Sequence, residues 1–223
     1  MRLHITTADF GKENPISKIT LPEQINNVHE ITTSCYNDLN TNNSRRNSLH
    51  VRTKSKIPKM LEWMKVSADY YIWMDSNFEI ISNNFADSII KYIGENLICL
   101  YNHPWNKTIQ QELESIEKQI EKQNVYHISR YCGEPLREQV NSYLSDNTFI
   151  DDSLFSLGFF IYSRKIVENT NYNILTDWFF HSCYWSIQDQ LSFPYLLKKH
   201  KVKFSTFNEG NIYSNQFVKY KGY

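Results

Sequence analysis

The chain has 223 residues and a mass of 26.6 kDa, which suffices for one α/β domain with a core on both sides of a sheet. Its 24 Lys and Arg balance its 24 Asp and Glu, so it lacks the basic excess of a nucleic-acid-binding protein, and we expect no such partner. No apolar run approaches the ~20 residues that cross a bilayer, and residues 1–4 lack the apolar stretch of a secretory signal. We therefore expect no membrane span and a cytoplasmic location.

The N-terminal segment predicts a strand that opens into a loop. Residues 3–7 alternate in polarity and are rich in β-branched side chains, which favours a short strand, and residues 8–18 are polar. A first strand that ends in a polar loop is a common place for a nucleotide. Residues 37–47 are crowded with Asn, Ser and Thr, which indicates an exposed loop or a mobile flap.

The next segment leads into the strongest strand pattern of the chain. Residues 49–52 are compatible with a second strand, and Pro58 suits the first turn of a helix over 59–64. Residues 70–74 are apolar on both faces, which predicts a central strand buried between layers. Its polar continuation, 75–77, then lies at the carboxyl end of that strand.

Strands and helices alternate through the rest of the chain. Predicted helices cover 85–93, 108–123, 136–143 and 175–184, and predicted strands cover 96–100, 154–162 and 201–207. Gly158, inside a strand, marks the close approach of another group. This alternation predicts an α/β fold with a mostly parallel central sheet and helices on both faces, in a single domain over 1–223.

A carboxylate and a carboxamide follow the buried strand two residues apart. Asp75 and Asn77 project to the same side of an extended chain, so both oxygens can reach one hard cation. Such a cation, with positions open for phosphate oxygens, would neutralise a departing diphosphate. The alternative is a strand-end turn with an Asx cap, which the same residue types form.

Basic residues cluster ahead of this strand. Arg52, Lys54, Lys56 and Lys59 surround Pro58. Arg52 offers a bidentate fork and Lys56 a point charge for a diphosphate, and the alternative is a solvated basic loop.

Further acidic candidates lie in the second half. Asp189 stands between two glutamines in an apolar and aromatic neighbourhood, where a carboxylate needs partners such as a sugar hydroxyl or a cation, unless it is the N-cap of a helix. Asp151 and Asp152 form an acidic pair, and a surface turn accounts for at least one of them. No zinc-hydrolase histidine spacing, nucleophile elbow, P-loop or dinucleotide fingerprint is present.

Several of these segments together resemble one enzyme family. They are 6–9 (Thr-Thr-Ala-Asp), Arg52 and Lys56 ahead of Pro58, 73–77 (Trp-Met-Asp-Ser-Asn), Gly158, and 189–193 (Asp-Gln-Leu-Ser-Phe). In this order they resemble the GT-A-fold glycosyltransferases over most of the chain, including members that glycosylate viral capsid proteins. The resemblance implies a single Rossmann-like GT-A domain, with a nucleotide-binding half over about 1–105 and an acceptor-side half over about 106–223. It also implies the host cytoplasm as the location if the protein is viral.

The resemblance implies a UDP-sugar donor, a glycan or glycoprotein acceptor, and Mn²⁺, or Mg²⁺ in its place, at a DXD-type motif. Asp75 and Asn77 would be its metal ligands. Residues placed at the nucleotide sugar are Thr6, Ala8, Asp9, Arg52, Lys56, Met74, Ser76 and Gln190. Asn77 departs from the usual Asp, which would weaken the metal site, and the third ligand has no clear match, although Asn208 and Glu209 are candidates.

The resemblance favours retention of anomeric configuration, with Asp189 steadying the oxocarbenium-like sugar. An inverting enzyme would instead need Asp152 or Asp189 as general base. Two other functions stay open: a metal-dependent phosphohydrolase that uses Asp75, Asp151, Asp152 and Asp189, and a carbohydrate-binding module built on the 15 Tyr and 5 Trp. Further catalytic domains in a longer polypeptide also stay open.

Overall fold

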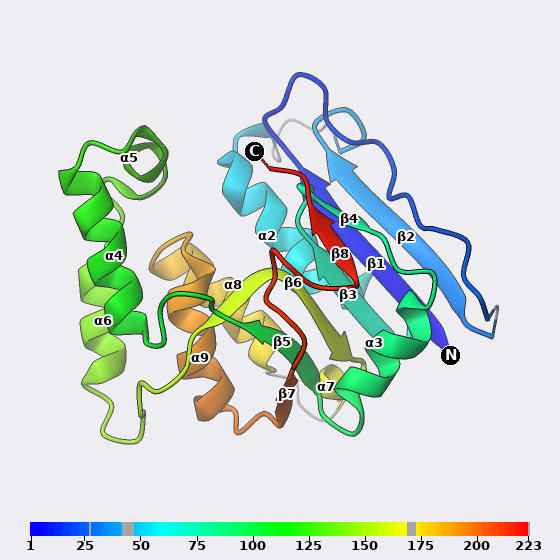
Figure 1. The fold of residues 1–223 in the computed structure, drawn as a ribbon. Helices are drawn as coiled ribbons and strands as arrows, with labels where there is room; N and C mark the ends of the chain where they lie inside the picture. Colours follow the sequence, from blue (N-terminus) through cyan, green and yellow to red (C-terminus); the bar gives the residue numbers. More distant parts are fainter. Residues whose placement is uncertain (27, 42–46, 169–172, 223) are drawn as a thin grey trace.

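The fold is built on a six-stranded sheet with a second, two-stranded sheet beside it (Figure 1). A computed structural model describes residues 1–26, 28–41, 47–168 and 173–222. The strands are β1 (Arg2–Asp9), β2 (Glu30–Asn37), β3 (Tyr70–Met74), β4 (Phe78–Ile80), β5 (Ile98–Asn102), β6 (Phe155–Ser163), β7 (Phe204–Thr206) and β8 (Val218–Tyr220).

The large sheet has the order β2-β1-β3-β6-β5-β7, and β4 pairs with β8. β1 is parallel to β2 and β3, and β5 is parallel to β7, while β6 runs antiparallel between β3 and β5. The predicted mostly parallel sheet is therefore confirmed, with β6 reversed. Since β3 and β5 both run against β6, the carboxyl ends of β1, β3 and β5 meet at one edge of the sheet. In Figure 1 this edge faces the helical lobe that contains α5.

Helices cover both faces of the sheet, as predicted. The helices are α2 (Val51–Leu61), the 3-10 helix η1 (Glu62–Met64), α3 (Phe85–Ile93), α4 (Ile109–Glu121), α5 (Val125–Tyr131), α6 (Leu136–Leu144), α7 (Lys165–Glu168), α8 (Ile174–Tyr184) and α9 (Asp189–Lys199). One core cluster joins the sheet to α3 and the small sheet, and a second joins it to α2, α8 and α9. A third cluster lies between α4, α6 and α9, at the lobe on the left of Figure 1.

The period-2 pattern of β3 explains how it serves both cores. Tyr71 and Trp73 lie in the cluster with α2, α8 and α9, whereas Ile72 and Met74 lie in the cluster with α3. The buried central strand predicted at 70–74 is confirmed with the same bounds.

The predicted strand over 49–52 and the predicted start of a helix at Pro58 were wrong, and the strand β2 was not predicted. The second strand of the chain is β2, and residues 51–61 form one helix that His50 caps and that contains Pro58 in its interior. Lys54, Lys59 and Met60 are buried on one side of this helix. Propensity failed here because tertiary packing overrides the loss of one helical hydrogen bond at proline. Part of the loop expected over 37–47 lies outside the described residues.

Within the described part of the chain, no helix is both long and apolar enough to cross a membrane.

Candidate functional site

The carboxyl end of β1 places a buried carboxylate at the edge of the sheet. Asp9 is 3% exposed, and its Oδ1 accepts a hydrogen bond from Ser76 Oγ at 2.7 Å and an ion pair from Lys12 at 2.9 Å. Its Oδ2 accepts the backbone N–H of Ile16 at 2.9 Å. Burial raises the pKa of Asp9, but these donors outweigh burial and lower it overall. Asp9 and Ser76, both predicted at the nucleotide sugar, are therefore brought together.

Asp75 lies beside Asp9 in the fold, directly after β3. Its Oδ1 accepts a hydrogen bond from Trp73 Nε1 at 2.7 Å, and its backbone N–H donates to Gly158 O at 2.7 Å. A Cβ on Gly158 would lie 3.1 Å from Asp75 Oδ2. The close approach predicted from a glycine within a strand is therefore confirmed, and the approaching group is the Asp75 carboxylate.

Asn77 carries an oxygen that lacks a partner. Its Oδ1 is buried and accepts no hydrogen bond, although a buried acceptor normally has one. A hard cation bound at Asp75 and Asn77, with water and phosphate oxygens completing its shell, would satisfy this atom, so the two residues fit Mn²⁺ or Mg²⁺. Glu209, one candidate for the third metal ligand, accepts a hydrogen bond from Gln216. The described residues contain no group of three or more His, Cys, Asp or Glu that could hold a metal, so substrate oxygens would have to supply the remaining ligands.

Asp189 is held by two lysines of α2. Lys56 Nζ lies 2.5 Å and Lys59 Nζ 2.6 Å from the same Oδ2 of Asp189, which begins α9. Lys56 and Lys59 are three residues apart, so the helix presents both on one face. Asp189 is 6% exposed and thus needed such partners, as its apolar surroundings predicted.

The charged groups of this cluster shift one another's pKa values. Burial raises the pKa of Asp189, but the two ammonium groups outweigh burial and hold that pKa well below its usual range. Burial lowers the pKa of Lys56 to about 8, against the opposing effect of Asp189. Burial raises the pKa of Asp75, which Lys59 and Lys56 oppose, so Asp75 belongs to the same electrostatic cluster.

Aromatic rings surround the Lys59 ammonium. Its Nζ lies 5.5 Å from the centre of the Trp73 ring, 5.7 Å from Trp178 and 5.9 Å from Phe160. Lys59 was expected only as one of four basic residues around Pro58, and its pairing with Asp189 was not predicted. The only available signal was its spacing of three from Lys56, which is helical, and that signal was lost when the helix was placed after Pro58.

The remaining predicted nucleotide-sugar residues are distributed unevenly. Thr6 pairs with Trp73 across β1 and β3, and its hydroxyl is buried without a partner. Ala8 is buried at the end of β1. The Met74 side chain, by contrast, packs in the core with α3. Arg52 stands in the first turn of α2. Burial raises the pKa of Tyr131 in α5, and the charges of Asp189 and Arg52 also act on that pKa, Asp189 raising it and Arg52 lowering it.

The polar residues around Asp189 link α9 to α4. Gln188 Nε2 donates to Glu112 Oε1 at 2.9 Å and to Gln190 Oε1 at 3.1 Å, and Gln190 Nε2 donates to Phe155 O at 3.1 Å. Gln190 therefore points its amide at the start of β6. Its hydrogen bonds fix the amino end of α9, where Asp189 stands.

Asp151 and Asp152 do not join the cluster. Asp151 accepts the backbone N–H groups of Ile109 and Gln110 at the start of α4. Asp152 is exposed and pairs with Lys198 at 2.6 Å, near the far end of α9 from Asp189. Nine residues of helix separate Lys198 from Asp189, which is about 13 Å. Asp75 and Asp189 lie in one cluster, but Asp151 and Asp152 are engaged elsewhere, so the four carboxylates do not form the single cluster that a two-cation phosphohydrolase would need.

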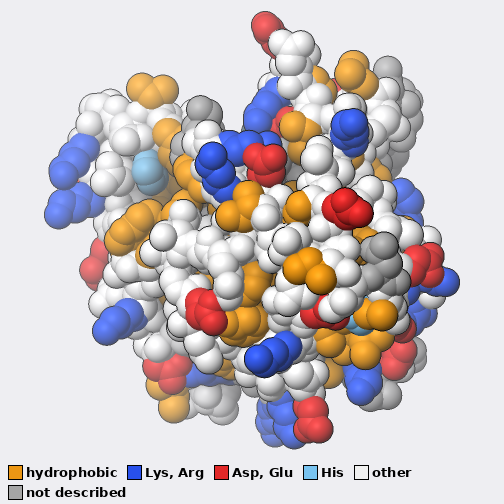
Figure 2. Space-filling model, turned by 45° about the vertical axis from the view of Figure 1, so that its right-hand side comes forward, with side chains coloured by type: hydrophobic (Ala, Val, Ile, Leu, Met, Phe, Trp, Pro, Cys, Tyr) orange, Lys and Arg blue, Asp and Glu red, His pale blue; other side chains and the backbone are white. Residues whose placement is uncertain are grey.

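Figure 2 shows a hollow in the upper surface of the molecule, with acidic and basic side chains gathered at its base. The strand ends that carry Asp9 and Asp75 also face upward in Figure 1.

No family model and no curated protein matches the chain. Among solved structures, it is similar to mouse xyloside xylosyltransferase 1 in its apo form, with 7% identity, a TM-score of 0.49, and coverage of 93% of this chain and 85% of that one. It is also similar to a glycosyltransferase involved in the glycosylation of the major capsid of PBCV-1, with 9% identity, a TM-score of 0.46, and coverage of 92% and 81%. The chain is also similar to A197 from STIV, with 12% identity, a TM-score of 0.41, and coverage of 93% of this chain and 82% of that one.

Two of these three proteins are glycosyltransferases. Their likeness to this chain is one of overall fold.

Proposed function

We propose that this protein is a glycosyltransferase that takes a sugar from a UDP-sugar and transfers it to a glycan or glycoprotein acceptor. The observation that carries the proposal is the cluster at the carboxyl edge of the sheet. There, Lys56 and Lys59 neutralise Asp189 next to Asp75, and a buried oxygen of Asn77 lacks a partner. A viral capsid glycoprotein is the acceptor class that the sequence resemblance implies.

The site matches the charge that such a transfer develops. The bond between the anomeric carbon and the diphosphate breaks, a bond to an acceptor hydroxyl forms, and the hydroxyl proton passes to the departing phosphate. Arg52, in the first turn of α2, and Lys56, on its inner face, would stabilise the negative charge on UDP. Mn²⁺ or Mg²⁺ at Asp75 and Asn77 would add Lewis-acid stabilisation of the same leaving group.

Asp189 is poorly suited to the role of a general base. Its lowered pKa and its two ammonium partners make it a poor proton acceptor. Asp152, the other candidate base, is exposed and paired with Lys198. Both observations favour retention over inversion.

A donor hydrolysis assay tests the proposal. We would follow UDP release from UDP-glucose, UDP-galactose, UDP-N-acetylglucosamine and UDP-xylose, with Mn²⁺ and with EDTA. We expect turnover of at least one donor that EDTA abolishes and that Asp75→Ala lowers by about 100-fold or more. The matched control is Asp87→Asn in α3, whose carboxylate bonds to Asn26 and His29. Release of phosphate from p-nitrophenyl phosphate without turnover of any UDP-sugar would contradict the proposal.

A further inference from the structure

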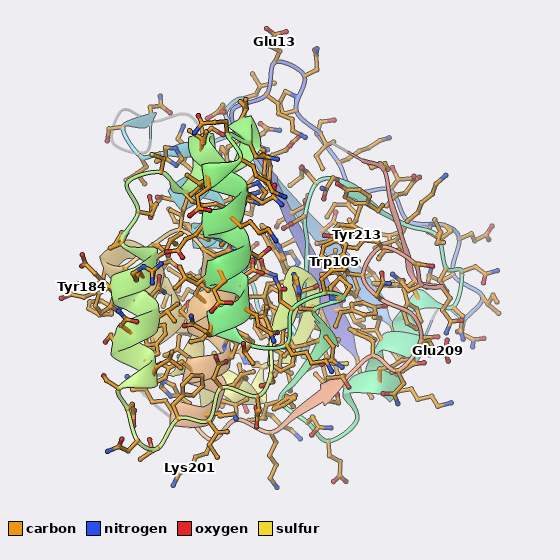
Figure 3. The ribbon with its side chains drawn as sticks, turned by 60° about the vertical axis from the view of Figure 1, so that its left-hand side comes forward. Glu13, Trp105, Tyr184, Lys201, Glu209 and Tyr213 are labelled. Atoms are coloured by element: carbon orange, nitrogen blue, oxygen red, sulfur yellow. The ribbon has the colours of Figure 1, made fainter. Side chains whose placement is uncertain are left out.

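Two aromatic side chains lie open to solvent next to the site. Trp105 is 72% exposed and Tyr213 is 41% exposed, and their rings stack with centroids 5.5 Å apart and an angle of 25° between planes. Figure 3 shows them side by side, with Tyr184 far from them at the left edge of the view. Exposed aromatic residues are common on protein surfaces, so the position of this pair relative to the site decides what it can bind.

The loops that carry the pair are braced, so the rings are held in place. His103 Nδ1 accepts the backbone N–H of Asn106 at 2.9 Å, and the His103 ring meets the edge of Trp105 at 5.6 Å. Around Tyr213, Asn211 Oδ1 accepts the Tyr213 N–H at 2.8 Å, and the Tyr220 ring lies 5.1 Å away. A rigid aromatic surface loses little entropy when it binds.

The pair lies at the same edge of the sheet as Asp75. Trp105 follows the carboxyl end of β5, and Asp75 follows the carboxyl end of β3, with β6 alone between these strands. Two strand spacings are about 10 Å. Ile212, next to Tyr213, would lie 3.2 Å from a Cβ on Gly158, the residue that meets Asp75 Oδ2. The loops that carry the aromatic pair and Asp75 therefore meet at the same edge of the sheet, beside Gly158.

We propose that Trp105 and Tyr213 form a platform on which a pyranose ring of the acceptor glycan stacks. The assignment to the acceptor rests on the proposed function. The predicted nucleotide-sugar residues Thr6 and Asp9 are on β1, which lies on the other side of β3 from β5. The platform is thus on the side of Asp75 away from β1.

The chemistry of the pair fits a sugar. A pyranose has an apolar face of C–H groups and a polar rim, and a stacked indole and phenol offer apolar faces with N–H and O–H groups at their edges. Two rings also form too small a surface for a stable protein partner, which buries about 800 Å² on each side.

Saturation-transfer NMR with simple sugars tests the platform. The probes are the methyl glycosides of glucose, galactose, mannose, xylose, fucose and rhamnose, each measured with and without UDP and Mg²⁺, which is diamagnetic. We expect transfer to at least one glycoside, about tenfold weaker in Trp105→Ala and about threefold weaker in Trp105→Phe, as the loss of one stacking contact predicts. Tyr213→Phe keeps the ring and should keep the signal.

The control is Tyr184→Ala, which removes another exposed aromatic that stacks on a neighbour, Phe180, with rings 5.7 Å apart. It should match the wild type, and thermal unfolding shows that each variant is folded. No transfer to any glycoside, or equal transfer in Trp105→Ala, would overturn the platform, as would a Trp105→Ala variant that loses UDP but keeps the glycosides. Glycoside signals that depend on Trp105 without any UDP signal would support the platform and contradict the proposed function.

Discussion

At the scale of single residues, the site depends on how two lysines share one carboxylate. Lys56 and Lys59 both bind Oδ2 of Asp189 within 2.6 Å, and all three side chains are nearly buried. A buried carboxylate with two ammonium partners leaves one positive charge in excess, and this charge is available to a diphosphate. Residue types could point to Asp189 and Lys56 as candidates, because a lone acid in an apolar segment needs a partner. They could not show that the two side chains meet across 133 positions of the chain.

The lowered pKa of Lys56 predicts that donor binding is sensitive to alkaline pH. Its ammonium form, which would attract a diphosphate, is present below a pKa of about 8 and is lost as the pH rises through that value. We therefore expect the affinity for UDP in Mg²⁺ to weaken above pH 8. In Lys56→Arg the guanidinium stays charged, so the decline should disappear up to pH 10. Calorimetric titration of UDP from pH 6 to 10 measures both profiles, and identical profiles would remove Lys56 from the diphosphate site.

At the scale of elements, the strands and helices that bury the most apolar surface were predictable. The pattern over 70–74 gave β3 with its correct bounds, and the stripe over 108–123 gave α4, with Thr108 as its cap. The strand β2 and the helix α2 could not be predicted. β2 lies at the edge of the sheet, where half-buried side chains obscure the alternation of apolar and polar residues. Pro58 in the interior of α2 further masked a helix that packing against α8 and β1 maintains.

The start of α4 gives a prediction at this scale. Asp151 accepts the N–H groups of Ile109 and Gln110 at 2.8 and 3.1 Å, so it stabilises the amino end of this helix from outside it. Asp151→Ala should lower the free energy of unfolding by about 1 kcal/mol, as the loss of a cap does, and leave UDP affinity unchanged. Urea unfolding and UDP titration measure the two effects. A large loss of UDP affinity at unchanged stability would show that Asp151 belongs to the site.

At the scale of the whole molecule, the site exists because distant segments end at one edge of the sheet. The strand β1 ends at Asp9, β3 is followed by Asp75, and β5 leads to Trp105. The helix α9 begins at Asp189. Alternating strands and helices predicted a mostly parallel sheet, and a parallel sheet collects the carboxyl ends of its strands. The reversed direction of β6 and the return of the C-terminal segment to Gly158 depend on tertiary packing, so no local pattern could predict them.

Several of these segments pack closely around Gly158. A Cβ there would lie 3.1 Å from Asp75 Oδ2 and 3.2 Å from both Ile212 and Phe78. Gly158→Ala should therefore displace Asp75 and the C-terminal segment, with a loss of stability of about 1 kcal/mol, typical of mild overpacking. We expect UDP and metal affinity to fall by more than this loss explains. If thermal unfolding shifts while UDP affinity stays at the wild-type level, Gly158 serves packing alone.

The proposed function requires that UDP and a divalent cation bind together at Asp75. Calorimetric titration of UDP into the protein, with and without Mn²⁺, tests it most directly, on the wild type, Asp75→Ala and the control Asp87→Asn. We predict that the wild type and Asp87→Asn bind UDP tightly only with Mn²⁺, and that Asp75→Ala loses this metal-dependent binding. Absence of UDP binding in both conditions, or equal binding by Asp75→Ala, would contradict the account.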